Sequence, residues 1–402
     1  MLRGKRVVLG VCGGIAAYKA AELTRELIRE GAEVRVVMTQ NATRFVTPLT
    51  FQVLSGRRVL TDTFGDDGYD MNHIALADYA ELMIIAPATA NMVGKAASGI
   101  ADDLLSTTVM TLRCPVLFCP AMNAAMYESP IVQDNLEKLR RAGFHVLEPA
   151  AGDLACGVSG KGRLPEISLI VTEAARLLSP QDLAGERILV TAGPTREPFD
   201  PVRFITNYSS GKMGYALAAA ARRRGAEVVL VSGPVTLPPP YGVEAVMVES
   251  AREMFEKVME HLERSTVIIK AAAVADYRPA VRSRGKIKKT KGPLILELER
   301  NPDIIAEVGK RKGDRILVGF AMESENLVEN AAAKMKAKGM DFIVANDLNE
   351  EGAGFQHDTN KVRIIMNDGS IESLPLMDKL EVAHAILDRV KKLRRERKRD
   401  GS

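Results

Sequence analysis

The chain has 402 residues, 46% of them hydrophobic, and a formal net charge of +4 at pH 7. This composition supports buried cores and excludes an extended disordered protein, and the length predicts two or three domains. The positive charge does not point to a nucleic-acid-binding body, because residues 388–402 alone carry +5 and the remainder sums to −1. We expect this basic segment to be the exposed end of a last helix followed by a solvated terminus.

Membrane and disulfide-rich classes are also excluded. No stretch approaches the roughly 20 apolar residues of a membrane span, and the apolar run after the first residues is too short for a signal peptide. The four cysteines, Cys12, Cys114, Cys119 and Cys156, lack CxxC spacing, so neither a disulfide framework nor a zinc ribbon is expected. These features favour a cytoplasmic protein in a reducing compartment. Aromatic residues make up only 5%, which argues against stacking on single-stranded nucleic acid.

Each half of the chain opens with the same pattern. Residues 4–38 and 185–232 each contain an apolar strand, a glycine-bearing turn, an Ala-rich helix, the tetrapeptide Gly-Ala-Glu-Val and a second apolar strand. Further apolar strands are expected at 82–86, 115–119, 145–148, 266–270, 315–319 and 341–345. Strands that alternate with helices predict βαβ units. We therefore predict two three-layer α/β domains, 1–180 and 181–402, with mainly parallel, Rossmann-like sheets and with ligands at the carboxyl ends of the strands.

The first glycine turn resembles a dinucleotide-binding fingerprint but departs from it. Cys12 stands where a GxGxxG motif starting at Gly10 needs its second glycine, and the strand ending at residues 37–41 carries no acid for a ribose hydroxyl. The hydroxyl and amide groups at 39–41 suit a phosphate, which favours a mononucleotide such as FMN over NAD. The alternative is a glycine turn that only packs a helix on a strand.

Small and hydroxyl residues follow the strand at 82–86. Residues 86–91 read Ala-Pro-Ala-Thr-Ala-Asn, and a second loop carries Ser-Thr-Thr at 106–108. Such residues let a flat ring and a phosphate approach the backbone, although they also serve as ordinary helix caps. A glycine-rich loop at 152–166 carries Cys156 in its middle, and this thiol is either catalytic or inert.

Three features together resemble the flavin-dependent cysteine decarboxylases: His73, the PxMNxxM run at 120–126 and the ACGxxGxGR run at 155–163. The nearest resemblance is to the phosphopantothenoylcysteine decarboxylases. It implies a flavodoxin-like domain in which FMN oxidises the substrate thiol, provides an electron sink for CO2 loss and then reduces the enethiol. By resemblance, His73 is the base, Asn123 holds the substrate carboxylate and Cys156 donates a proton. The implied FMN contacts are Gly13, Gly14, Ile15, Thr39, Thr43, Pro87, Ala88, Thr89, Ser106, Thr107, Ala121 and Met122.

The second half carries an anion-binding pattern at the start of its first helix. Ser209-Ser-Gly-Lys-Met-Gly214 places serines and glycines at a helix N-terminus. It is not a Walker A loop, because Thr206 occupies the place of the first glycine and Met213 that of the Ser or Thr. The alternative is a serine cap and a surface lysine. Six cationic residues lie within residues 282–291. This segment is either a solvated loop, a loop that binds an anion, or a nucleic-acid-binding patch, although no aromatic residues are interleaved with the cations.

The motifs GPTREPFDPVRFITN, SSGKMG, AAVADYRP, KIKK and NPDI occur in this order and resemble the CTP-using phosphopantothenate–cysteine ligases from about 187 to 375. The implied reaction forms an acyl-cytidylate from CTP, which the cysteine amine then cleaves. By resemblance, Lys286 stabilises charge in the first step, Asn207 acts on the acyl-cytidylate, and Asp276 belongs to the nucleotide and Mg2+ site. The alternative for Phe320 is an ordinary core position, and the alternative for Lys334 and Lys338 is the solvated face of a helix. The implied nucleotide contacts are Ser209, Ser210, Gly211, Lys270, Ala271, Ala272, Asp276, Lys286, Pro302, Asp303, Ile304, Ile305, Phe320, Lys334 and Lys338.

Together the two resemblances span nearly the whole chain and match the bifunctional Dfp or CoaBC family of coenzyme A biosynthesis. They imply the small substrates 4′-phosphopantothenate, cysteine and CTP, with no nucleic-acid or membrane partner. They also imply a homo-oligomer, a dodecamer built from trimeric decarboxylase and dimeric ligase contacts. The competing interpretations are an NAD(P)-linked oxidoreductase with two Rossmann-like domains and a nucleotide-binding or DNA-associated regulator.

Overall fold

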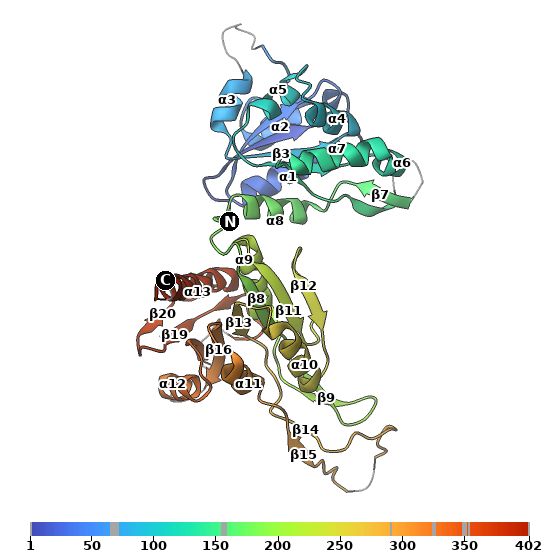
Figure 1. Cartoon of the computed structure of the whole chain (residues 1–402). Helices are drawn as coiled ribbons and strands as arrows, with labels where there is room; N and C mark the ends of the chain where they lie inside the picture. Colours follow the sequence, from blue (N-terminus) through green and yellow to red (C-terminus); the bar gives the residue numbers. More distant parts are fainter. Residues whose placement is uncertain are drawn as a thin grey trace. The chain divides into compact units, whose positions relative to one another are not determined.

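A computed structural model describes residues 2–64, 72–153, 159–289, 292–323, 327–347, 352 and 354–400. The chain divides into two compact units, Met1–Ser179 and Pro180–Ser402. Each unit is built around its own sheet (Figure 1). We refer to them as the first unit and the second unit and describe each by itself.

The first unit contains a five-stranded parallel sheet in the order β2-β1-β3-β4-β5, and a small β6-β7 hairpin. Its strands are β1 (Arg6–Val11), β2 (Glu33–Met38), β3 (Leu82–Ala88), β4 (Val116–Pro120), β5 (His145–Val146), β6 (Ala150–Asp153) and β7 (Ser159–Arg163). Its α-helices are α1 (Ala17–Arg29), α2 (Pro48–Ser55), α3 (Asn72–Tyr79), α4 (Ala90–Ser98), α5 (Leu104–Thr111), α6 (Ala124–Glu128), α7 (Pro130–Arg141) and α8 (Ile167–Leu177), with a 3-10 turn η1 at Ala42–Arg44.

Alternation along the strands divides the apolar core of the first unit between the two faces of the sheet. Val7 and Leu9 of β1 pack with α1, α2 and α8, whereas Val8 packs with α3, α4, α5 and α7. Because both faces are covered, the strands are apolar at nearly every position, as expected for a buried parallel sheet. The result is a three-layer arrangement, as the sequence predicts.

The second unit contains an eight-stranded sheet in the order β12-β11-β8-β13-β16-β17-β19-β20. The first six are parallel, and β19 and β20 extend the edge in antiparallel fashion. The sheet strands are β8 (Arg187–Ala192), β11 (Glu227–Ser232), β12 (Glu244–Met247), β13 (Val267–Lys270), β16 (Ile316–Glu323), β17 (Phe342–Asp347), β19 (Val362–Met366) and β20 (Ile371–Ser373). Three small pairs are formed by β9 (Arg196–Pro198) with β10 (Phe204–Thr206), β14 (Tyr277–Pro279) with β15 (Leu298–Arg300), and β18 (Thr359–Asn360) with β21 (Met377–Asp378).

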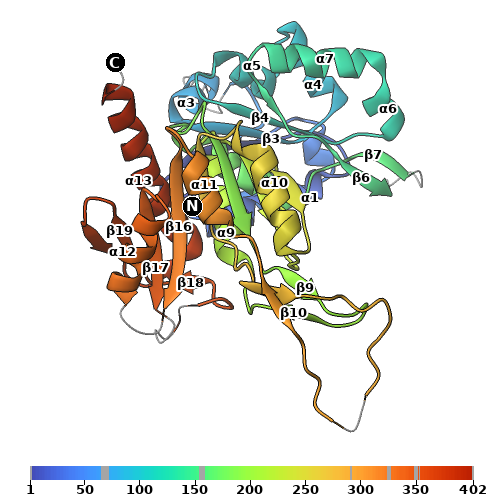
Figure 2. The ribbon, with the colours of Figure 1, turned by 60° about the horizontal axis from the view of Figure 1, so that its bottom comes forward.

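Helices again cover both faces of this sheet (Figure 2). One face packs against α9 (Lys212–Arg223) and α13 (Lys379–Asp400). The other packs against α10 (Ala251–Leu262), α11 (Ile304–Arg311) and α12 (Leu327–Ala337). The predicted α/β class with mainly parallel sheets is therefore confirmed in both units, while the antiparallel edge and the three small strand pairs carry no clear signal in the sequence.

The predicted last helix with a basic, exposed end is confirmed in part: Lys392, Arg395 and Arg399 of α13 are exposed, whereas three other basic residues of its end have acidic partners. In α13, Lys391 Nζ lies 2.6 Å from Asp182 Oδ2, and Arg394 Nε lies 3.0 Å from Glu186 Oε2. Arg397 pairs with Asp341. These three basic residues therefore hold the last helix to the body of the second unit, because acidic partners distant in the sequence meet them there. No helix within the described ranges has the length and apolar content needed to cross a bilayer.

Candidate active sites

The first unit has a cavity of about 900 Å3 where β1 and β3 end. In the strand order, β1 lies between β2 and β3. The connection from β1 to β2 and the connection that reaches β3 therefore run to opposite sides of β1, and the chain segments diverge at this point of the sheet. Such a switch point is the usual ligand site of an open α/β sheet. The wall comes from the segments after β1, β2, β3 and β4 and from the β6-β7 hairpin.

The glycine turn after β1 brings backbone close to backbone. A Cβ atom on Gly13 would lie 2.4 Å from Asn41 Cβ and 2.6 Å from the Asn41 carbonyl carbon, so no larger residue fits there. At the following helix, the N-cap residue Ala16 gives α1 no side-chain cap. The first N–H groups of α1 are therefore available to an anion, and the helix dipole favours a phosphate at this place.

Eight predicted residues lie on the wall of this first cavity. They are Gly13, Gly14, Ile15, Thr39, Thr89, Ala121, Met122 and Asn123. Asn123 is the N-cap of α6, and its Oδ1 accepts a hydrogen bond from Ala125 N at 2.9 Å. β4 ends at Pro120, the first residue of the PxMN motif, so Asn123 follows the end of this strand and reaches the cavity.

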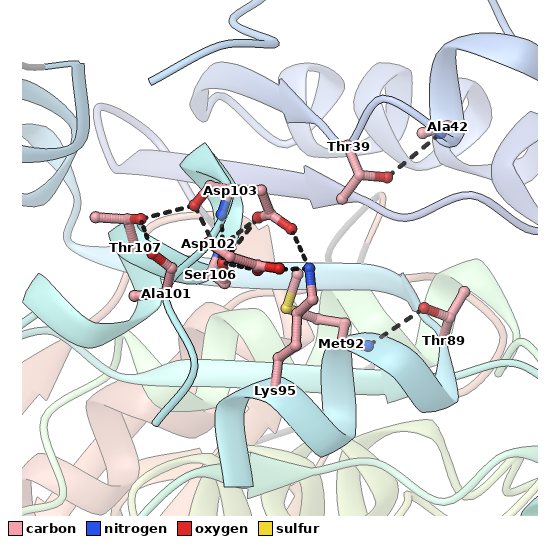
Figure 3. A network of polar contacts seen from close by, with 10 residues as sticks. All are labelled: Thr39, Ala42, Thr89, Met92, Lys95, Ala101, Asp102, Asp103, Ser106 and Thr107. Atoms are coloured by element: carbon pink, nitrogen blue, oxygen red, sulfur yellow. Dashed lines mark hydrogen bonds and ion pairs between the residues drawn. The ribbon is translucent and has the colours of Figure 1, made fainter. Parts of the chain in front are cut away.

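Five predicted cofactor contacts lie behind the wall instead: Thr43, Pro87, Ala88, Ser106 and Thr107. Ser106 takes part in the cap of α5, and the Thr107 hydroxyl bonds a backbone carbonyl of the preceding turn (Figure 3). Ser106 N and its hydroxyl form a capping box with Asp103, and Thr107 Oγ1 donates to Asp103 O at 2.7 Å. Thr43 Oγ1 donates to Gln40 O at 2.8 Å. Within one chain these side chains therefore bond to their own segments, and their predicted contact with the cofactor stays a prediction.

The sequence interpretation missed Lys95 and Asp103, which line the cavity together with the charged residues Lys19, Asp153 and Arg163. Asp103 carries a capping signature, since Ser106 follows three residues later, but nothing in the spacing shows that Lys95 reaches across to it. In the sequence, Cys12 marks only a departure from the dinucleotide-binding motif. It is 1% exposed on the wall, and burial raises its pKa to about 12, so its thiol stays neutral.

Of the two remaining residues assigned to decarboxylation, the structure describes only His73, and it does not line this wall. His73 lies in the first turn of α3, and its Nδ1 is buried without a hydrogen-bond partner among the described residues. Cys156 lies outside the described residues. A single chain therefore brings Asn123, but not His73, to the first cavity.

The second unit has a cavity of about 730 Å3 where β8 and β13 end, again at the switch point of the sheet. Asn207 and all but one of the predicted nucleotide contacts line it. These are Ser209, Ser210, Gly211, Lys270, Ala271, Ala272, Asp276, Pro302, Asp303, Ile304, Ile305, Phe320, Lys334 and Lys338. Five separated stretches of sequence meet here: three lie at a strand end or a helix start, Phe320 lies within β16, and Lys334 and Lys338 come from the C-terminal end of α12.

Positive charge is concentrated in this second cavity. Burial, reinforced by Lys334 and Lys338, lowers the pKa of Lys270 to about 8. Lys338 Nζ also pairs with Asp303 Oδ2 at 2.8 Å. Three lysines around one hollow repel one another, and a polyanion such as a triphosphate relieves that repulsion. The alternative in which Lys334 and Lys338 form a solvated face is therefore wrong.

The serine and glycine turn closes one end of this cavity. Gly211 is the N-cap of α9 at φ +79°, and it provides no side-chain cap. Ser210 Oγ donates to Phe355 O, and Lys212 Nζ donates to Gln356 O at 2.7 Å. Lys212 is thus not the surface lysine of the alternative interpretation. Sequence reasoning missed Lys379, whose pKa burial lowers to about 8 and which also lines the cavity.

Lys286 is the exception among the predicted nucleotide contacts. It is exposed between β14 and β15 and does not line the cavity, nor do the other described cations of 282–291. Arg203 Nη2 donates to Ile287 O at 3.0 Å, and Ile287 N donates to Asp200 Oδ2 at 3.2 Å. These bonds fix the base of the loop beside the turn between β9 and β10. The expectation that this loop faces the triphosphate is not met within one chain.

Asp276 is the residue predicted to hold a cation. It is exposed on the wall of the second cavity, and its backbone carbonyl accepts from Asn301 N at 2.8 Å. In the described parts of the chain, no three His, Cys, Asp or Glu side chains gather as a ready-made metal site. One carboxylate suits Mg2+, which is commonly held by one or two carboxylates together with substrate phosphates and water.

The two cavities belong to a two-domain flavoprotein. Residues 1–179 match the family model described as Flavoprotein, and residues 183–393 match the DNA/pantothenate metabolism flavoprotein C-terminal domain. The coenzyme A biosynthesis bifunctional protein CoaBC of Bacillus subtilis (strain 168) is 48% identical over 401 residues, which is 98% of this chain and 99% of that protein. The CoaBC protein of Mycobacterium tuberculosis (strain ATCC 25618 / H37Rv) is 46% identical and covers 96% of each chain.

The chain belongs to the CoaBC family of bifunctional coenzyme A biosynthesis proteins. Among solved structures, the C-terminal domain of a CoaBC protein is 45% identical, with a TM-score of 0.47, and it covers 54% of this chain and 99% of that one. Membership of this family excludes the NAD(P)-linked oxidoreductase and the DNA-associated regulator that the sequence left open.

Proposed function

We propose that the second unit ligates 4′-phosphopantothenate to cysteine at the expense of CTP, and that the first unit decarboxylates the product to 4′-phosphopantetheine with FMN. The observation that carries this proposal is the arrangement of the motifs. Each unit brings most of the described motif residues of one activity to one cavity at the switch point of its own sheet, with His73 and Lys286 as the catalytic exceptions. The order of reaction follows from the chemistry, because the amide must form before the cysteinyl carboxylate can be lost from it.

In the ligation, the substrate carboxylate attacks the α-phosphate of CTP, and pyrophosphate leaves. The cysteine amine then attacks the acyl-cytidylate and releases CMP. Phosphoryl and nucleotidyl transfers depend mainly on positioning and on positive charge. Lys270, Lys334 and Lys338 supply that charge, and the uncapped start of α9 supplies N–H donors. Asp276 would hold Mg2+, which neutralises charge on the phosphates.

Asn207 is proposed to act on the acyl-cytidylate. Its Nδ2 donates to Ala273 O at 3.0 Å, so the side chain is oriented at the rim of the second cavity. Lys286 is proposed to stabilise charge during cytidylate formation. Because it lies off the wall in its own chain, we propose that assembly brings it to a cavity.

FMN fits the first cavity, since the site offers a close glycine turn, an uncapped helix N-terminus for the phosphate, and apolar walls at Ile15 and Met122. When bound, FMN supplies the reversible oxidation that creates an electron sink. Asn123 is proposed to hold the substrate carboxylate, His73 to accept a proton and Cys156 to donate one. Since His73 lies off the wall, we propose a homo-oligomer, with trimeric first units and dimeric second units forming a dodecamer.

One incubation tests both activities. The full chain is mixed with 4′-phosphopantothenate, cysteine, CTP and Mg2+, and the products are followed by mass spectrometry. We expect CMP, pyrophosphate and 4′-phosphopantetheine to form together. Formation of the amide without CO2 loss would refute the assignment of the first unit, and absence of pyrophosphate would refute that of the second.

Two variants separate the halves. Lys286→Gln should abolish pyrophosphate release while leaving the decarboxylation of supplied 4′-phosphopantothenoylcysteine intact. Cys156→Ser should leave ligation intact and accumulate the oxidised enethiol, two hydrogens lighter than the normal product. Lys310→Gln, at an exposed lysine of α11, is the control and should match the unaltered chain in both assays. Normal pyrophosphate release by Lys286→Gln, or a normal rate of 4′-phosphopantetheine release by Cys156→Ser, would remove those roles.

A further inference from the structure

A charged cluster forms part of the wall of the first cavity, and no role described above uses it. Lys95 of α4 places its Nζ 2.6 Å from Asp102 Oδ1 and 2.8 Å from Asp103 Oδ2 (Figure 3). The Lys95 side chain is 17% exposed, and both Lys95 and Asp103 line the cavity. Partly buried ionic groups on the wall of a ligand site are screened less than surface charges, so the occupant experiences them.

Two interactions fix the position of Asp103: it caps α5 and it binds Lys95. Its Oδ1 accepts from Ser106 N at 2.8 Å as the cap of α5, and its Oδ2 accepts from Lys95 Nζ. Burial favours the neutral form of Asp103, but hydrogen bonds from Lys95 and Ser106 outweigh it and lower the pKa. Likewise, burial opposes the charge on Lys95, while hydrogen bonds to Asp102 and Asp103 raise its pKa. Lysine and aspartate therefore remain ionised at neutral pH.

The charges of the cluster nearly cancel. One lysine faces two aspartates, and the N-terminus of α5 adds about half a positive charge beside Asp103. Removing one member leaves the wall charged, with a sign that depends on which member is removed. A partly exposed ion pair usually contributes little to stability, so stability alone does not explain the cluster. Its place on the cavity wall points to a role toward the occupant.

We propose that Lys95 and Asp103 set the electrostatic potential at the bound flavin, with Lys95 favouring the phosphate dianion and the anionic reduced ring, and Asp103 holding and balancing Lys95. This inference rests on the proposed binding of FMN in the first cavity. In this proposal, a lysine and an aspartate outside the recognised motifs control the affinity for the cofactor and its reduction potential. Neither residue transfers a proton or an electron in this role.

The test compares Lys95→Met and Asp103→Asn in the full chain. Lys95→Met leaves two aspartates without their cation, so FMN should bind at least tenfold more weakly and reduced FMN should lose more affinity than oxidised FMN. A tenfold change in the ratio of the two affinities lowers the two-electron potential by ~30 mV. Asp103→Asn leaves excess positive charge, so the potential should shift in the opposite direction. FMN dissociation constants and dye-equilibrated potentials are the readouts.

Controls separate this electrostatic role from a structural one. Lys95→Arg keeps the charge and should restore the potential to that of the unaltered chain. Lys138→Met removes an exposed lysine of α7 that pairs with Asp134 and should change neither readout. CTP-dependent pyrophosphate release by the second unit of the same chain reports the amount of intact protein. Riboflavin, which lacks the phosphate, should lose less affinity than FMN in Lys95→Met.

The outcomes are distinct. Shifts of opposite sign for Lys95→Met and Asp103→Asn support the proposal. Shifts of the same sign, potentials unchanged in both variants, or a failure of Lys95→Arg to restore the potential would overturn it. If the unaltered chain binds no FMN, the proposed function of the first unit fails as well. If the unaltered chain binds FMN and both variants match it, only the present inference fails.

Discussion

Replacing Lys270 by methionine should stabilise the second unit at pH 7 while weakening CTP binding. Burial, Lys334 and Lys338 bring the Lys270 pKa to about 8, against an ordinary value of 10.5, even though Asp303 and Asp276 act in the opposite direction. At 1.36 kcal/mol for each pH unit, this difference corresponds to ~3 kcal/mol of destabilisation that the charged lysine causes in the nucleotide-free chain. Methionine retains the stem of the side chain and removes the charge.

The pH dependence has a definite sign. Below pH 8 the lysine is protonated in both the folded and the unfolded chain, and the folded state bears the whole penalty. Between pH 8 and 10.5 the unfolded chain binds more protons, so the stability of the unaltered protein rises with pH. Above pH 10.5 the lysine is neutral in both states. The advantage of Lys270→Met should therefore be largest at or below pH 7 and disappear by about pH 10.5.

Calorimetry on the full chain measures this effect. The transition of the second unit is the one that CTP shifts upward in the unaltered protein. For a domain of this size, ~3 kcal/mol raises the melting temperature by roughly 6–12 °C. Lys257→Met, at an exposed lysine of α10 paired with Glu260, should leave the transition unchanged. A Lys270→Met transition at or below that of the unaltered chain at pH 7 would refute the reasoning, as would an advantage that persists at pH 10.5.

Three further predictions follow from the packing of the two units. Gly13→Ala should weaken FMN binding about tenfold, because the added Cβ would lie 2.4 Å from Asn41 Cβ. Quenching of FMN fluorescence measures the affinity, and an unchanged affinity would show that the backbone of the turn can move to accept the methyl group. Phe51→Ala, at a fully buried side chain, should cost the first unit roughly 3–5 kcal/mol in urea unfolding, whereas a loss below 1 kcal/mol would contradict its place in the core. Asp341→Asn should cost the second unit about 2 kcal/mol, since the buried carboxylate accepts from Leu317 N at 2.7 Å and pairs with the partly exposed Lys312 and Arg397; a thermal scan with no change would exclude this role.

Local signals in the sequence were sufficient for the architecture. The two openings with Gly-Ala-Glu-Val predict βαβ units, and both fold as such, because apolar strands and amphipathic helices are encoded within a few residues of one another. Motif order also predicts most of the second cavity. Residues as distant as Ser210 and Lys338 meet there because each stands at the end of a strand or in a helix that borders the same edge.

Side-chain partnerships were not predictable in this way. Ser106 looks like a cofactor ligand in the sequence, yet it caps α5, and Asp103 and Lys95 occupy the cavity wall instead. The basic tail looks solvated, yet Lys391 pairs with Asp182 across more than two hundred residues. Such choices depend on which polar group lies within hydrogen-bond distance once the helices are packed, and sequence spacing carries no information about that distance.

The sequence by itself therefore determined the fold class, the family and the edges of the sheets where ligands bind, since periodicity and motif order are local properties. Only the tertiary structure decided how the charges at those edges are buried and paired, and which unpredicted charges join them. It placed Lys270, Lys334 and Lys338 around one hollow and Lys95 with Asp103 on the wall of another, and it left Lys286 outside the cavity of its own chain. The physical reason is that electrostatic interactions depend on distance and burial, which the chain acquires only when its layers pack together.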